Sequence, residues 1–158
     1  MIEKEELAGL VPHKGRMLLL TRINEYNLEE QTLHAEYHIT EDCLFYDAAV
    51  GGVPAWVAFE FMAQAIAALS GLRGRQRAEK PSIGFILGVS SLQIGLPFFT
   101  TGSTVELKVK ESGCMDQVFS FYGEAFLEGR KVLEGKLTVM EVHDGQLQSF
   151  IKENRQIG

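Results

Sequence analysis

The stretch PAWVAFEFMAQAIAALSGLRG, residues 54–74, decides the fold of this chain. It begins with Pro54, which suits the first turn of a helix because proline has no N–H to leave unpaired there, and it ends among glycines, which favour a helix end. The residues between are apolar on nearly every face, so the sequence predicts one long helix that other elements must enclose. Glu60, Gln64 and Ser70 interrupt the apolar run, which argues against membrane insertion.

The sequence on both sides of this helix predicts strands. Before it, residues 17–27 (MLLLTRINEYN) are a β-like apolar run, and residues 32–40 (TLHAEYHIT) alternate apolar and polar side chains, as in a half-buried strand. After it, alternation and glycine-centred turns predict four more strands, over residues 82–94, 103–113, 117–129 and 130–143. This order favours an α+β architecture, with an antiparallel sheet wrapped around one central helix.

Length and composition are those of one ordinary domain. The 158 residues contain no repeat or linker, so we expect a single domain over residues 1–158, with a short helix within residues 3–11 and a loop at residues 73–82. A net charge of -6 disfavours nucleic acid as a partner. The first residues carry no secretory signal, which predicts a cytoplasmic protein, and the distant pair Cys43 and Cys114 predicts neither a zinc site nor a disulfide framework.

Glu60 and Gln64 are the informative polar pair of the helix. They lie four residues apart and therefore share a face, and their neighbours are apolar. A carboxyl group that loses water has a raised pKa, which brings it toward the range useful in general acid–base chemistry. We expect Glu60 to act as an acid–base group that Gln64 holds by a hydrogen bond. The alternative is that Glu60 faces a solvated groove or a structural partner.

Three segments together resemble a known family. They are residues 12–23 (PHKGRMLLLTRI), the helix start at residues 54–65 and the strand-rich residues 82–109. The chain resembles, over residues 10–142, the hot-dog fold dehydratases that act on 3-hydroxyacyl thioesters carried by acyl carrier protein. The motif E-x-M-A-Q, with a proline six residues before the glutamate, is the most specific element. Within that family it is most similar to the dehydratase-like proteins encoded with aryl polyene biosynthesis genes.

The sequence departs from the family pattern at two positions. The family places a catalytic histidine fourteen residues before the helix glutamate, and this position is Tyr46 here. The family glycine whose N–H polarises the thioester carbonyl is Ala55, which keeps a backbone donor at the helix N-terminus. The resemblance implies that the glutamate and the histidine remove an α-proton and protonate the leaving 3-hydroxyl. The missing histidine therefore needs a substitute.

Three residues are candidates for that substitute. Asp47 would form a carboxylate pair with Glu60, and Tyr46 would donate a hydrogen bond to the 3-hydroxyl. His13 would enter the substrate pocket from the PHKG turn, although a plain turn histidine is the favoured interpretation of that residue. The other three histidines, His34, His38 and His143, are interpreted as surface residues.

Two further functions use the same residues. A hot-dog thioesterase places a carboxylate on its central helix to attack, or to activate water at, a polarised thioester carbonyl. A non-catalytic acyl-binding subunit would instead complete the interface of an active paralogue. The helix motif favours the dehydratase, whereas the missing histidine favours the silent subunit.

The predicted partners are acyl carrier protein and further copies of the chain. A basic run follows the helix at Arg73, Arg75, Arg77 and Lys80. It either docks an acidic carrier protein or is a solvated loop. The resemblance implies a homodimer or a higher even oligomer, with two sheets side by side.

Neither dehydration nor thioester hydrolysis requires a metal or an organic cofactor. An acyl tunnel or plain core accounts for the apolar residues Phe85, Ile86, Leu87, Leu96, Phe98 and Phe99.

Overall fold

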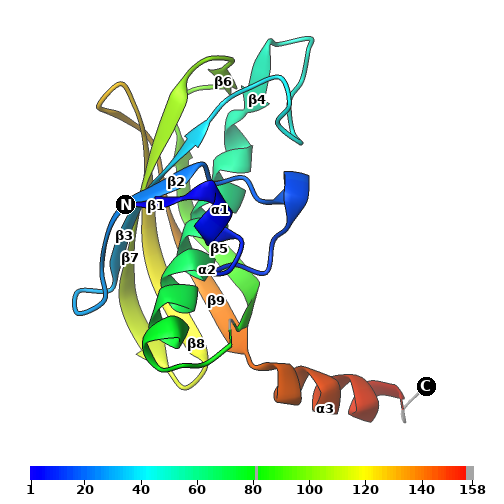
Figure 1. Cartoon of the computed structure of the whole chain (residues 1–158). Helices are drawn as coiled ribbons and strands as arrows, with labels where there is room; N and C mark the ends of the chain where they lie inside the picture. Colours follow the sequence, from blue (N-terminus) through cyan, green and yellow to red (C-terminus); the bar gives the residue numbers. More distant parts are fainter. Residues whose placement is uncertain (81, 156–158) are drawn as a thin grey trace.

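A seven-stranded antiparallel sheet is the largest structural unit of the protein (Figure 1). The structure is a computed structural model that describes residues 1–80 and 82–155, so Pro81 of the predicted loop and the last three residues of the predicted domain lie outside it. In their order across the sheet, the strands are β1 (Ile2–Glu3), β2 (Arg22–Asn27), β3 (Thr32–His38), β7 (Thr104–Met115), β8 (Val118–Leu127), β9 (Arg130–Val142) and β5 (Ile83–Ile94).

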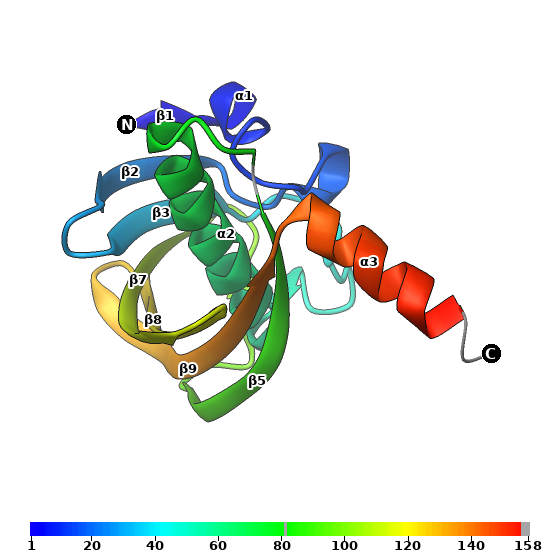
Figure 2. The same cartoon turned by 90° about the horizontal axis from the view of Figure 1, so that it is seen from below.

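Two short strands and a few helices complete the chain. Strand β4 (Gly52–Pro54) pairs with β6 (Phe98–Thr100). The remaining elements are helices α1 (Lys4–Leu7), α2 (Ala58–Gln76) and α3 (Asp144–Arg155), with 3-10 turns at Gly15–Met17 and Ala55–Val57. Figure 2 shows the sheet curling around α2, while α3 projects away from it. This is the predicted α+β architecture of an antiparallel sheet on one central helix.

Helix α2 is enclosed as its apolar sequence requires. Phe61, Met62, Ala65, Ala68 and Leu69 are fully buried and pack into one core cluster with the inner faces of the strands. The segment 55–76 is long and apolar enough to cross a bilayer, but 67% of its most apolar window is buried inside the protein. Its hydrophobicity is therefore explained by the surrounding sheet.

The structure differs from the sequence prediction in several places, and the short strands β1, β4 and β6 were not predicted. The first long strand begins at Arg22 and not at Met17, because the leucines at 18–20 form a buried connection beside α2. Helix α2 continues to Gln76, four residues into the predicted loop 73–82. Helix α3, which follows the last predicted strand directly, was not predicted.

One edge of the sheet and one stripe of α2 are left uncovered. Strand β5 pairs on one side with β9, and six of its large apolar side chains are 38–55% exposed. They are Phe85, Ile86, Leu87, Val89, Leu92 and Ile94. Trp56, in the 3-10 turn that precedes α2, is 53% exposed, and Ala63, Ala67 and Ser70 of α2 are half-buried. A long apolar edge strand of this kind is typical of a surface that pairs with another chain.

Candidate functional site

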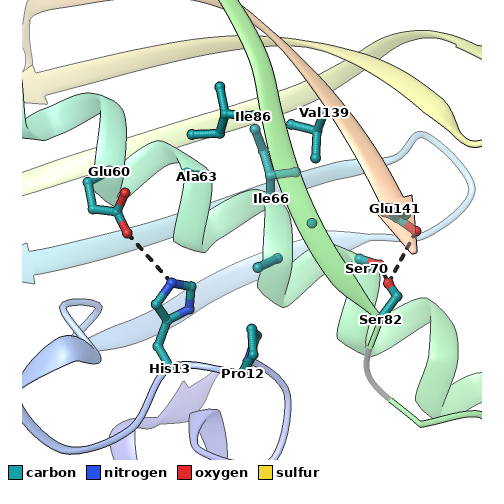
Figure 3. Close-up of a pocket in the computed structure, with 12 residues that line it drawn as sticks. Pro12, His13, Glu60, Ala63, Ile66, Ser70, Ser82, Ile86, Val139 and Glu141 are labelled. Atoms are coloured by element: carbon teal, nitrogen blue, oxygen red, sulfur yellow. Dashed lines mark hydrogen bonds and ion pairs between the residues drawn. The ribbon is translucent and has the colours of Figure 1, made fainter. Parts of the chain in front are cut away.

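Glu60 lies in the first turn of α2, opposite a histidine of the N-terminal segment (Figure 3). The Nε2 atom of His13 is 3.6 Å from Oε1 of Glu60, and each side chain is 26% exposed. The Nδ1 atom of His13 is buried and has no hydrogen-bond partner among the described residues. The imidazole of His13 thus lies beside Glu60 of the same chain. It comes from the N-terminal segment, whereas the family histidine comes from the loop before the helix.

Gln64 explains why these two side chains meet. Its side chain is fully buried, its Oε1 accepts the Leu19 N–H at 2.8 Å, and its Nε2 donates to the Met17 carbonyl at 2.7 Å. The predicted bond to Glu60 is the weakest of the three, at 3.4 Å. Gln64 therefore fastens the segment that follows His13 onto α2, and it contacts the carboxylate as well.

A groove runs from this pair along α2 toward the C-terminal end of the helix. Glu60 and His13 lie at one end, and Ser70, Ser82 and Glu141 lie at the other. Small and aliphatic side chains from α2, β5 and β9 line the middle: Ala63, Ile66, Ala67, Ile86 and Val139. Of the predicted tunnel residues, Ile86 lines this groove, whereas Phe99 is buried in the core. The groove has the composition of an acyl-chain site with a carboxylate at its mouth.

Ala55 is buried at the start of the 3-10 turn that precedes α2. Its N–H, predicted to polarise a thioester carbonyl, donates to the Pro97 carbonyl at 3.0 Å. This bond extends the β4–β6 pairing into the helix start. In this conformation the donor is engaged within the chain, and the positive end of the helix dipole remains at the same place.

Tyr46 and Asp47 lie away from Glu60 of the same chain. Asp47 is exposed, and its Oδ1 accepts the Ala49 N–H at 2.9 Å, while its backbone pairs with Gly52. Tyr46 is half-buried and packs against the core. Neither lines the groove. Within one chain their positions shape the turn before β4, and a contact with a Glu60 carboxylate would require a second chain.

The four residues of the predicted basic run have three different environments. Arg73 is 14% exposed and forms 2.8 Å ion pairs with Glu111 and Glu141, so its charge is neutralised inside the protein. Arg75 pairs with Glu6 at the surface. The third environment is a solvent-exposed hollow at the end of α2, lined by Arg77 and Lys80.

The remaining predicted residues have surface environments. His34 and His38 stand on the outer face of β3 and are 39% and 41% exposed, with Glu25 and Glu36 as partners. His143 is exposed beside the hollow of Arg77. Among the residues that the structure describes, no group of three or more His, Cys, Asp or Glu side chains is placed to hold a metal ion.

Comparison with known proteins identifies the family. The profile of the ApeP-like family, described as ApeP dehydratase, matches residues 5–152. The chain belongs to this family. It is 25% identical over 141 residues to the 3-hydroxyacyl-[acyl-carrier-protein] dehydratase FabZ of Chlamydia trachomatis, with 87% of this chain and 91% of that one covered.

Solved structures support the dehydratase assignment and the fold. The dehydratase heterocomplex ApeI:P of Xenorhabdus doucetiae contains a chain that is 27% identical, with a TM-score of 0.83 and coverage of 92% of this chain and 96% of that one. A protein of Ralstonia eutropha JMP134 described as a thioesterase has a TM-score of 0.57 at 19% identity, covering 75% of this chain and 82% of its own. At that identity the likeness shows the hot-dog fold alone. The predicted family, fold and dehydratase-like class are confirmed.

Sequence reasoning placed less weight on His13 than the structure gives it, and it missed the polar far end of the groove. The proximity of His13 to Glu60 depends on the bonds of Gln64 to the backbone of Met17 and Leu19, which no local pattern reveals. Ser70 did interrupt the apolar helix, but its neighbours Ser82 and Glu141 come from other elements.

Proposed function

We propose that this protein dehydrates 3-hydroxyacyl thioesters carried by acyl carrier protein, with Glu60 and His13 as its acid–base pair, in fatty acid or aryl polyene biosynthesis. The observation that carries the proposal is the 3.6 Å approach of His13 Nε2 to Glu60 Oε1 at the mouth of an apolar groove. Gln64 pre-organises the pair, because its buried bonds to the N-terminal segment make the approach a property of the fold.

The reaction requires a proton acceptor near C2 and a proton donor near the hydroxyl oxygen on C3. One member of the pair takes the proton from C2, the C3–O bond breaks, and the other member protonates the leaving oxygen, so the products are a 2-enoyl thioester and water. A carboxyl and an imidazole together supply both functions. The positive end of α2 favours the enolate charge that develops on the thioester oxygen.

The test is mass spectrometry of purified protein incubated with 3-hydroxyacyl carrier protein. Loss of one water is expected, and both Glu60→Gln and His13→Asn should slow it by at least about 100-fold, the usual contribution of a positioned acid or base. His34→Asn is the matched control, because His34 is a surface histidine. Full activity of His13→Asn would refute the pair. If Asp47→Asn were the inactive variant, the second group would be the Asp47 carboxylate presented by a neighbouring chain.

Thioester hydrolysis is the second candidate, because a carboxylate at the start of α2 can also attack, or activate water at, a polarised thioester carbonyl. Proteins described as thioesterases share the fold. Its product is a free acid and holo carrier protein, which the same spectra distinguish from an enoyl product. No reaction on either substrate would favour the non-catalytic subunit.

Oligomerisation follows from the exposed faces of the chain. Ile86 of the apolar β5 edge and the half-buried residues Ala63, Ala67 and Ser70 of α2 line the groove, so a second hot-dog chain packed against this face would cover both elements. The partner is either a second copy or a catalytic paralogue, as in the heterocomplex named ApeI:P. Light scattering on the chain alone, and after co-expression with a paralogue, distinguishes the two.

Arg77 and Lys80 are the cations proposed to dock acyl carrier protein, and Arg77→Glu should raise KM with little change in kcat.

A further inference from the structure

Helix α3 extends past the β5 edge of the sheet, away from the other strands (Figure 2). Its first turn is tied to the β7–β8 turn, where Gln117 Nε2 donates to Gln146 Oε1 at 2.7 Å. No other hydrogen bond or ion pair joins the described side chains of α3 to the sheet. A 12-residue helix is only marginally stable in water by itself, because its few backbone bonds barely offset the cost of nucleation. Packing against another chain would supply the missing stability.

A hollow of about 530 Å³ lies between α3 and the outer face of the sheet. Met140 and Val142 belong to this outer face, because they alternate along β9 with the buried Leu137 and Val139. Phe85, directly opposite Met140 in the register of β5 and β9, completes an apolar floor. The helix side of the hollow is lined by polar residues, which are Gln146, Ser149 and Glu153. Burying polar side chains on an apolar floor costs free energy, so the space under α3 is left open to another chain.

The C-terminal end of β5 presents a different surface on the same outer face. Gln93 is exposed and lies opposite Glu134 in the register, and Lys131 forms ion pairs with Glu134 and Glu124. Two carboxylates and one ammonium group leave this surface negatively charged. Roughly 27 Å of strand separates Gln93 from Phe85. The part of α3 beyond the hollow spans only about 9 Å, so the helix does not reach this surface in its own chain.

Antiparallel pairing of two β5 strands would bring these surfaces together. With a twofold axis near the middle of the strand, the Gln93 end of a second copy lies beside the Phe85 end of the first. The symmetry makes the contact reciprocal, so each α3 lies over the C-terminal end of the other chain's β5. The charges agree, because the exposed Lys152 of α3 meets the negative surface at Glu134. One chain thus carries both an unsupported helix and a surface that supports it, which favours a second copy as the occupant.

We propose that α3 is an arm that binds a second copy of this chain. It crosses the paired β5 strands and contacts the outer face of the second copy at Gln93 and Glu134, with Lys152 as the complementary charge. This inference rests on the proposed pairing at β5, and it does not depend on the reaction that the groove carries out.

The test is thiol cross-linking of the full chain in solution. Ser149→Cys on α3 and Gln93→Cys on β5 are combined in a Cys114→Ser background, because Cys114 is exposed whereas Cys43 is buried. A short bis-maleimide should join two chains and give a covalent dimer on a denaturing gel. The matched control combines Ser149→Cys with Glu30→Cys, because Glu30 is exposed in the β2–β3 turn, far across the sheet from β5. This control and Ser149→Cys alone should give no covalent dimer.

Charge exchange gives a second readout that needs no cross-linker. Lys152→Glu should raise the dissociation constant of the dimer by about 5-fold, the effect of turning an exposed attraction into a repulsion. Glu134→Lys should do the same, and the two changes together should return the constant toward the wild-type value. Lys110→Glu is the matched control, because Lys110 is exposed on β7, away from both ends of β5.

The outcomes separate the arm from the pairing on which it rests. The mass of a single chain in light scattering would overturn both. A dimer without the cross-link between positions 149 and 93, or with one in either control, would overturn the arm and leave the pairing intact. A cross-link that forms only after co-expression with a paralogue would show that a second copy is the wrong occupant. Dehydration of the 3-hydroxyacyl substrate is measured separately, so it decides the proposed reaction and not the arm.

Discussion

Replacing Gln64 by methionine tests the central claim that one buried amide holds the N-terminal segment against α2. Methionine fills a similar volume but supplies neither the acceptor for the Leu19 N–H nor the donor for the Met17 carbonyl. A buried backbone group that loses its partner costs about 1–3 kcal/mol, and the Leu19 N–H is the more buried of the two. The expected loss in free energy of unfolding is therefore about 3 kcal/mol, equivalent to a fall in Tm of roughly 6–12 °C for a chain of this size.

The assay is thermal and urea unfolding at one fixed protein concentration, since an oligomer's stability depends on concentration. Gln76→Met is the matched control, because Gln76 is exposed near the end of the same helix. Gln64→Met should lose most dehydratase activity even where it is fully folded, because His13 is no longer held beside Glu60. A stability within 1 kcal/mol of the wild type, together with normal activity, would contradict this account of Gln64.

Two further predictions concern pH and close packing. Burial alone would raise the pKa of Glu36, but hydrogen bonds with Asn24 and His38 and the nearby Arg22 lower it below its ordinary value of 4.5. That stabilisation is present above about pH 4.5 and is lost as pH falls through the lower folded pKa, so Glu36→Gln should flatten the acid limb of the stability curve measured by urea unfolding. An unchanged limb would argue against the network. A Cβ on Gly71 would lie 2.1 Å from the Leu10 carbonyl oxygen, so Gly71→Ala should cost about 1–3 kcal/mol in spite of its better helix propensity. Gly113→Ala, with open space around it, should be nearly neutral in the same thermal scan, and a higher Tm for Gly71→Ala would show that the close approach is absent.

The strands and the central helix were predictable because their patterns are local. Alternation along residues 32–40 places Leu33, Ala35 and Tyr37 inside, and the structure buries all three. The apolar run at residues 17–20 was wrongly predicted to be part of a strand. Its leucines are buried beside the core, but they lie in the connection before β2. Arg73 misled in the opposite way, since a basic residue beside other basic residues resembles a surface patch until its partners on β7 and β9 are known.

The sequence by itself determined that this protein is an antiparallel sheet around one apolar helix with a carboxylate near the start of that helix. Periodicity and composition involve residues that are close in the sequence, so they can be recognised from the sequence alone. The tertiary structure decided which histidine meets Glu60 and which polar groups close the far end of the groove. His13, Ser82 and Glu141 come from three separate parts of the chain, and their meeting depends on strand order and on buried hydrogen bonds such as those of Gln64. Contacts of that kind arise from packing between distant segments and leave no periodic signature in the sequence.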